Sequence, residues 1–175
     1  MAKVSFRYKH GGQVSDSIGL LISILVRYPE VATINYDPQS KVLQFTFMLT
    51  ELLDEPCLKV FTSKFIKCLE IFNRLEDRTP QEINLRYSHF NKMTVIEVKR
   101  DVETLTRGEI GLIIDLIREE FKEDLLAENS GDFLEEDLLL QEEIIEHMLE
   151  SMKGSVPQKK LIAFREEGRV LVFNK

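Results

Sequence analysis

The stretch from Val31 to Leu49 reads VATINYDPQSKVLQFTFML and decides the fold class. Its first six residues are rich in β-formers, and the DPQS segment after them suits a type I turn because proline presets φ at the second turn position. After the turn, Leu43, Phe45, Phe47 and Leu49 alternate with Gln44, Thr46 and Met48. Alternation with a period of two is typical of a strand with one buried face, so this stretch predicts a β-hairpin.

The segments around this hairpin alternate between strand and helix signals. We expect further strands at residues 4–8, 83–88 and 93–100, and helices from about Ser15 to the residue before Pro29 and from Asp54 to Asp77. The resulting order is β-α-β-β-α-β with one extra strand. That order predicts a ferredoxin-like α+β body, with two helices on one face of an antiparallel sheet.

The rest of the chain changes character after residue 101. Thr106 and Glu109 fit a capping box, and two amphipathic stripes from Thr106 to about Lys153 predict an acidic, antiparallel helical hairpin. Residues 161–164 and 170–173 flank a turn containing Gly168 and predict a C-terminal β-hairpin. Both faces of this hairpin are apolar, so we expect it to be buried, either extending the sheet or packing under the helices. The predicted units are residues 1–101 and 102–175, packed together as one compact body.

Charge is distributed unevenly along the chain. Of the 30 acidic residues, 17 lie between residues 101 and 158, where only 4 of the 23 lysines and arginines are found. The segments on either side are mildly basic, although the whole chain has a net charge of −7. An acidic overall balance opposes nonspecific binding to nucleic acid.

Two charged surfaces follow from the predicted elements. In a ferredoxin-like body, Arg7 and Arg86 would lie on adjacent strands and would form a basic patch with Lys9 and His10. Glu142, Glu143 and Glu146 would form an acidic face on the second helix of the hairpin. Surplus carboxylates that keep the protein soluble are the simpler interpretation of that acidic face. The alternative is docking onto a basic surface, either of this chain or of a partner.

No motif for catalysis, cofactor binding or metal binding is recognisable, so we predict no catalytic residues, no cofactor and no metal site. Glu143 and His147 are four residues apart, but helix phase directs Glu143 away from the apolar stripe. The spacing of Cys57 and Cys68 corresponds to about 16 Å along a helix, which is too far for a disulfide. We interpret both cysteines as reduced core residues.

Three functions remain open from the sequence. The favoured hypothesis is a non-catalytic interaction or regulatory module that self-associates as a homodimer or binds a protein partner, because an open sheet invites pairing. The second is a nucleic-acid- or ribosome-associated protein that uses a basic sheet face, and the third is an enzyme whose site is not visible in the sequence. No apolar run reaches the ~20 residues of a membrane span. We therefore expect a cytoplasmic protein without membrane contact.

Overall fold

The computed structural model describes residues 6–8, 16–128, 135–153 and 159–174. Within these ranges the chain forms seven strands and four α-helices, so the predicted α+β class is confirmed. The strands are β1 (Phe6–Tyr8), β2 (Thr33–Asp37), β3 (Val42–Leu49), β4 (Ile83–Phe90), β5 (Met93–Asp101), β6 (Leu161–Glu166) and β7 (Arg169–Asn174). The helices are α1 (Asp16–Arg27), α2 (Glu55–Leu75), α3 (Arg107–Phe121) and α4 (Glu135–Met152), with a 3-10 turn, η1 (Lys122–Asp124), after α3.

The described strands form one sheet in the order β1-β7-β6-β2-β3-β5-β4. Neighbouring strands are antiparallel except for β1 and β7, which are parallel. β2 and β3 form the hairpin that the sequence predicts, with Ile34 opposite Phe45. Lys41 closes the turn between them with a left-handed φ of 56°.

The ferredoxin-like strand order is wrong for this sheet. In a ferredoxin-like body the third strand lies between the first and the second. Here β3 lies between β2 and β5, and β1 pairs with β7 at the opposite edge of the sheet from β4. The C-terminal hairpin causes the difference, because β6 takes the position beside β2 and β7 offers its own free edge to β1.

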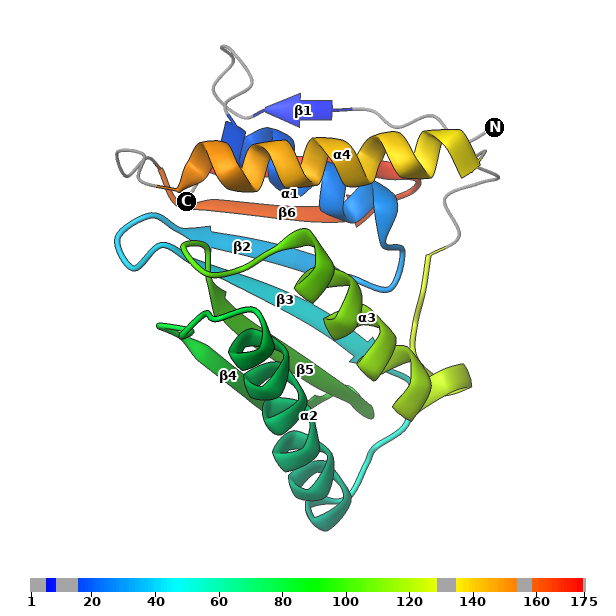
Figure 1. Cartoon of the computed structure of the whole chain (residues 1–175). Helices are drawn as coiled ribbons and strands as arrows, with labels where there is room; N and C mark the ends of the chain where they lie inside the picture. The colour runs from blue at the N-terminus through cyan, green and yellow to red at the C-terminus, as the bar shows by residue number, and fades with distance from the viewer. Residues whose placement is uncertain (1–5, 9–15, 129–134, 154–158, 175) are drawn as a thin grey trace.

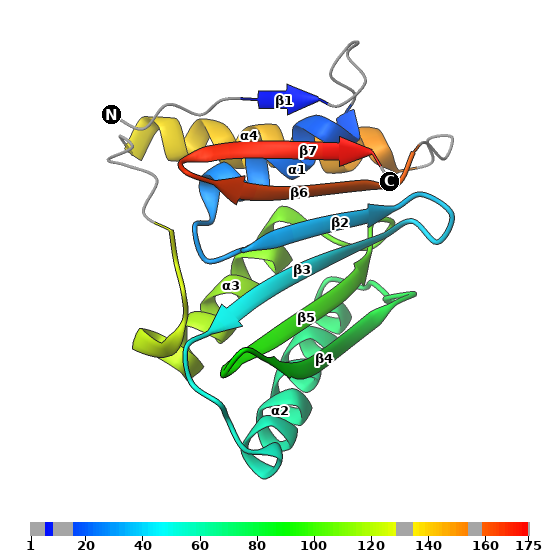
Figure 2. The same cartoon turned by 180° about the vertical axis from the view of Figure 1, so that it is seen from behind.

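The four described helices all cover one face of the sheet (Figures 1 and 2). α1 lies between the sheet and α4, and most of its residues are buried. This position explains why the sequence of α1 is apolar almost all round, since a helix with neighbours on two sides has little surface for polar side chains. α2 and α3 cover the other half of the same face.

α3 and α4 do not form the predicted antiparallel helical hairpin. α4 packs mainly against α1 and makes only limited contact with the start of α3. The stripe of α4 that contains the buried Ile145 and Leu149 therefore joins the core formed by α1 and the C-terminal hairpin. Helix periodicity identified this stripe correctly but could not identify the surface that it covers.

The C-terminal hairpin extends the main sheet. Leu161 and Ala163 of β6 face the helices and are buried, together with Val170 and Val172 of β7. The opposite side of the hairpin faces away from the helices, so the expectation that both faces would be buried is wrong. The sheet and its core cross the predicted boundary at residue 101, because β6 pairs directly with β2.

Candidate functional site

The face of the sheet that points away from the helices, called here the open face, is the largest surface that no described helix covers (Figure 2). Strand register places twelve of its residues in two parallel rows that cross six strands. The first row is Phe173, Ile162, Asn35, Gln44, Lys99 and Asn84. The second row is Leu171, Phe164, Thr33, Thr46, Glu97 and Arg86.

The β6–β7 end of the open face is apolar. Its four residues, called here the apolar quartet, are Ile162, Phe164, Leu171 and Phe173. The rings of Phe164 and Phe173 are stacked, with centroids 5.6 Å apart and planes inclined by 17°. Leu171 is buried, and the other three side chains remain partly exposed. Strands in a half-buried sheet place polar residues on their solvent side, so an apolar quartet there departs from the usual pattern.

Within these two rows, the middle and the β4 end are polar, whereas the positions beyond the second row include the apolar Met48 and Val95. Uncharged side chains of β2 and β3 occupy the middle, and Gln44 donates a hydrogen bond of 2.6 Å from Nε2 to Oε2 of Glu97. Glu97 lies opposite Arg86, and Lys99 follows in the next row. The two rows therefore change from apolar through neutral polar to charged, and both signs of charge are present at the charged end.

A pocket of about 420 Å³ opens where the β2–β3 turn meets the start of β6. We call it the Lys99 pocket. The residues of its lining that carry polar or charged side chains include Asn35, Asp37, Gln44, Glu82, Lys99 and Lys160. Three of these residues, Asn35, Gln44 and Lys99, belong to the first row of the open face. The pocket therefore lies on the polar part of that face, beside the apolar quartet.

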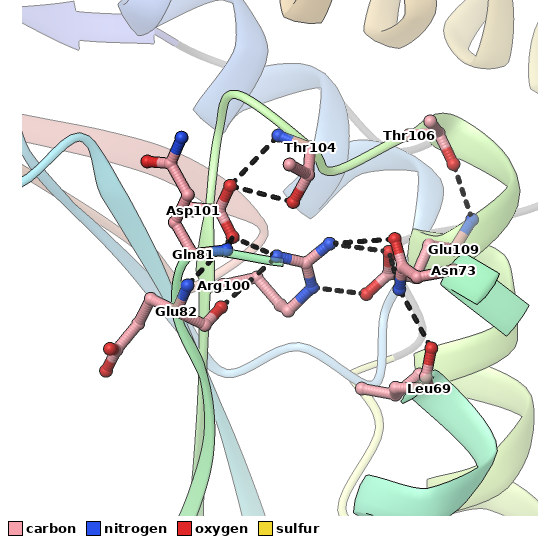
Figure 3. Close-up of polar contacts among 9 residues, drawn as sticks. All are labelled: Leu69, Asn73, Gln81, Glu82, Arg100, Asp101, Thr104, Thr106 and Glu109. Carbon is pink, nitrogen blue, oxygen red and sulfur yellow. Dashed lines mark hydrogen bonds and ion pairs between the residues drawn. The ribbon is translucent and has the colours of Figure 1, made fainter. Parts of the chain in front are cut away.

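Directly behind the pocket, on the helix side of the sheet, Arg100 is fully buried in a polar cluster (Figure 3). Its guanidinium pairs with both carboxylate oxygens of Glu109, one of them from Nη2 at 2.7 Å, and with Oδ1 of Asp101. It also donates to the carbonyl oxygen of Glu82 at 3.2 Å. Asn73 of α2 completes the cluster by donating to Glu109 at 2.9 Å and to the carbonyl oxygen of Leu69 at 2.8 Å.

The Asp101 carboxylate accepts hydrogen bonds from two segments, one at Gln81 and Glu82 and the other at Thr104. Its Oδ1 accepts hydrogen bonds from the backbone N–H groups of Gln81 and Glu82, at 3.0 and 3.1 Å. Its Oδ2 accepts from the backbone and the hydroxyl of Thr104, at 3.0 and 2.7 Å. Burial by itself would raise the pKa of Asp101, but these hydrogen bonds and the charge of Arg100 outweigh it and hold the pKa below its ordinary value of 3.8.

The Arg100 cluster is a structural element. Its residues leave no buried side-chain nitrogen or oxygen without a partner within the described part of the chain. A general acid, base or nucleophile needs an atom that can reach a substrate, and here each charged group is bound within the protein. The cluster joins β5, α2, the start of α3 and the segment that leads into β4. In this way it fixes the end of β5 that carries Lys99.

The capping prediction for α3 is confirmed at Thr106 and altered at Glu109. The Thr106 hydroxyl accepts from the N–H of Glu109 at 3.2 Å, as an N-cap should. In a capping box the Glu109 carboxylate would return to the Thr106 N–H. Instead the Glu109 carboxylate accepts hydrogen bonds from Arg100 and Asn73.

The predicted basic patch is not assembled. Arg7 lies on β1 and Arg86 on β4, at opposite edges of the sheet. Lys9 and His10 lie outside the described residues. The patch required the ferredoxin-like order, which would have made the strands of Arg7 and Arg86 neighbours. Arg86 is exposed on the open face, where Glu97 lies opposite.

The predicted acidic face lies on α4, and two of its three residues approach this chain's own helices. Glu142 accepts hydrogen bonds from Nε and Nη2 of Arg27 on α1, at 3.1 and 2.9 Å. Glu146 lies 4.0 Å from Nη1 of Arg107 on α3, and Glu143 is exposed. Among the described residues, Glu142 and Glu146 therefore lie near basic side chains of α1 and α3.

Free cysteines and clusters of metal-binding side chains are two further features that could support chemistry. Cys57 and Cys68 are free thiols, but Cys57 is exposed and Cys68 is only half-buried, so the prediction that both are core residues is wrong. Among the described residues, no group of three or more His, Cys, Asp or Glu side chains is arranged to hold a metal ion.

No described helix is long and apolar enough to cross a membrane.

Sequence reasoning missed the residues that distinguish the open face. Gln44 was expected only as an outward position of the strand from Leu43 to Leu49, and Asn35 and Lys160 carried no prediction of their own. The one available signal was the second apolar face of the C-terminal hairpin, which contains Phe164 and Phe173. Comparisons with protein-family models, with curated proteins and with solved structures gave no match to this chain, so any function has to be argued from this surface.

Proposed function

We propose that this protein is a non-catalytic interaction module that self-associates through the open face of its sheet. The observation that carries the proposal is the apolar quartet, with the stacked Phe164 and Phe173 at its centre. Burial of apolar surface stabilises an interface by ~25 cal/mol per Å². The quartet is a contiguous apolar area that borders the polar residues of β2, which is the contrast found between the core of an interface and its rim.

The size of the open face suits a second copy of the chain. Strands are spaced by ~4.8 Å and rise by ~3.3 Å per residue, so six strands of about six residues cover roughly 29 Å by 20 Å. Stable protein interfaces bury about 800 Å² of accessible surface on each partner. The area of the open face is therefore of the same order as the surface that one partner buries in a stable interface.

The charge distribution also favours a second copy of the chain as the partner. The acidic surplus of the chain lies between residues 101 and 158, which contribute α3 and α4 on the helix side. On the open face Glu97 is accompanied by Lys99 and Arg86. Two copies of this acidic protein therefore meet with the least mutual repulsion through this face, and a two-fold axis brings the same residues together from both copies.

The mass of the protein in solution tests the proposal, by light scattering or sedimentation over a range of concentrations. We expect the wild type to have twice the mass of one chain, and Phe164→Glu and Phe173→Glu to be monomers that keep the wild-type circular dichroism. Val60→Glu is the matched control, because Val60 is 71% exposed on α2, on the helix side. A wild type that stays monomeric, or a Val60→Glu variant that dissociates equally, would overturn the proposal.

Nucleic acid is the other partner that an open sheet with exposed aromatic rings can bind, by stacking of bases. The separation of Arg7 from Arg86 and the net charge of −7 oppose it. This hypothesis predicts a wild type that is monomeric and binds RNA in a salt-sensitive way, and a Phe164→Glu variant that has lost this binding. That outcome would contradict self-association.

A further inference from the structure

We propose that the Lys99 pocket binds a small zwitterion of the free α-amino acid class. The pocket belongs to the polar half of the open face and not to the apolar quartet, and a ligand titration tests it separately from the mass of the protein. The volume of about 420 Å³ lies within the ~300–1,000 Å³ of small-molecule sites.

The charges around the pocket are balanced in number and sign. Lys99 and Lys160 contribute two ammonium groups, and neither forms an ion pair or a hydrogen bond with another described residue. Asp37 and Glu82 contribute two carboxylates. A simple anion would be attracted by the lysines but repelled by the carboxylates. A simple cation would be attracted by the carboxylates but repelled by the lysines. A molecule with one carboxylate and one ammonium group satisfies both sets.

The neutral side chains of the pocket add hydrogen-bonding capacity. Asn35 Oδ1 is buried and has no hydrogen-bond partner in the described chain. A buried amide oxygen without a partner is unfavourable, and rotation of the Asn35 side chain toward the pocket would break no hydrogen bond at that oxygen. An N–H of the ligand can then supply the missing donor.

The Arg100 cluster holds part of the pocket in place. Glu82 donates its backbone N–H to Asp101 and accepts at its carbonyl oxygen from Arg100. Lys99 immediately precedes Arg100 on β5. A pocket with two charged residues on a fixed backbone loses less conformational freedom when a ligand binds, which is the physical basis of preorganisation.

The experiment is a titration of the full chain with each free proteinogenic amino acid, followed by calorimetry or by NMR chemical shifts. For any amino acid that binds, the N-acetylated form lacks the ammonium group and the corresponding amine lacks the carboxylate. We expect both analogues to bind about tenfold more weakly or worse, the loss that one charge-assisted hydrogen bond produces. Inorganic phosphate is the probe for a site that binds anions alone.

Two lysine variants and one control locate the site. Lys99→Met and Lys160→Met should each weaken amino-acid binding by about tenfold. Lys160 is exposed just before β6, so its replacement leaves the fold intact. Lys92→Met, in the β4–β5 turn away from the pocket, should bind as the wild type does. The proposal fails if no amino acid binds, if phosphate or an N-acetyl analogue binds equally well, or if Lys160→Met has no effect.

Discussion

Arg100 is the largest side chain that the described fold buries completely, and it is charged. Removing one partner from a buried ion pair is strongly destabilising because the remaining charge stays out of water. Arg100 is paired with Glu109 and Asp101, and Asn73 and the carbonyl of Glu82 complete its surroundings. The stability of the region where β5, α2 and α3 meet therefore depends on a few specific residues.

Asp101→Asn tests this dependence through pH. The folded-state pKa of Asp101 is lowered from 3.8, so its ionised form stabilises the fold above that pH, and the contribution is lost as pH falls through the folded-state pKa. At neutral pH we expect the substitution to reduce the free energy of unfolding by about 2–4 kcal/mol. The difference from the wild type should shrink below pH 3.8.

Urea unfolding at a series of pH values measures this difference. Asp115→Asn is a suitable control, because Asp115 is exposed on α3 and pairs only with Arg118 among the residues described. A difference for Asp101→Asn that stays constant through the acidic range would show that the carboxylate charge is not the source of the stability.

At the scale of elements, β3 has one face that lies entirely in the core. Leu43, Phe45, Phe47 and Leu49 are all completely buried, which confirms the predicted buried face. Phe47→Ala should lower the free energy of unfolding by about 3–5 kcal/mol, since it leaves a cavity between the sheet and the helices. Met48→Ala, one residue later on the open face, should cost well under half as much in denaturant unfolding. Equal effects would contradict the orientation of β3.

The contact between α1 and α4 combines an apolar seam with the pair of Arg27 and Glu142. Glu142→Lys should destabilise the fold by about 1 kcal/mol at low salt, because a partly exposed ion pair is lost and a like-charge contact replaces it. Thermal unfolding with and without added salt measures the effect, which salt should reduce. Glu143→Lys, at an exposed position with no such partner in the described chain, should match the wild type. If both reversals behave alike, the pair contributes nothing specific.

At the scale of the whole molecule, the fold is held together by segments far apart in the chain. β6 lies between β2 and β7, and Arg165 at its end reaches the C-terminal end of α1. There it donates hydrogen bonds to the carbonyl oxygens of Leu25 at 2.5 Å and Pro29 at 2.9 Å. Burial lowers the pKa of Arg165, and the carbonyl oxygens at the helix end compensate for its lost hydration.

A fragment of residues 1–101 should therefore fail to fold by itself. Without β6 and β7 the edge of β2 is unpaired, and without α4 the outer side of α1 is exposed. We expect the fragment to lack the cooperative thermal transition and the dispersed NMR spectrum of the full chain. A cooperatively folded fragment would show that the predicted boundary at residue 101 separates independent units.

Local periodicity in the sequence determined most elements of this protein. Alternation predicted β3 and its buried face, Asp54 and Thr106 marked helix starts, and the stripe on α4 was identified before its neighbour was known. These features depend on residues a few positions apart, which the chain itself brings together. The α+β class follows from them.

Only the tertiary structure decided the strand order, the position of α4 on α1, the open face and the Arg100 cluster. Each depends on which distant segments pair, and several pairings satisfy the same local pattern of apolar and polar residues. A strand with two apolar faces, such as the one containing Phe164, fits the centre of a sheet or its open side equally well. Competition among β1, β6 and β5 for the free edges of β2 and β3 is settled by the packing of the whole core, which no short stretch of sequence contains.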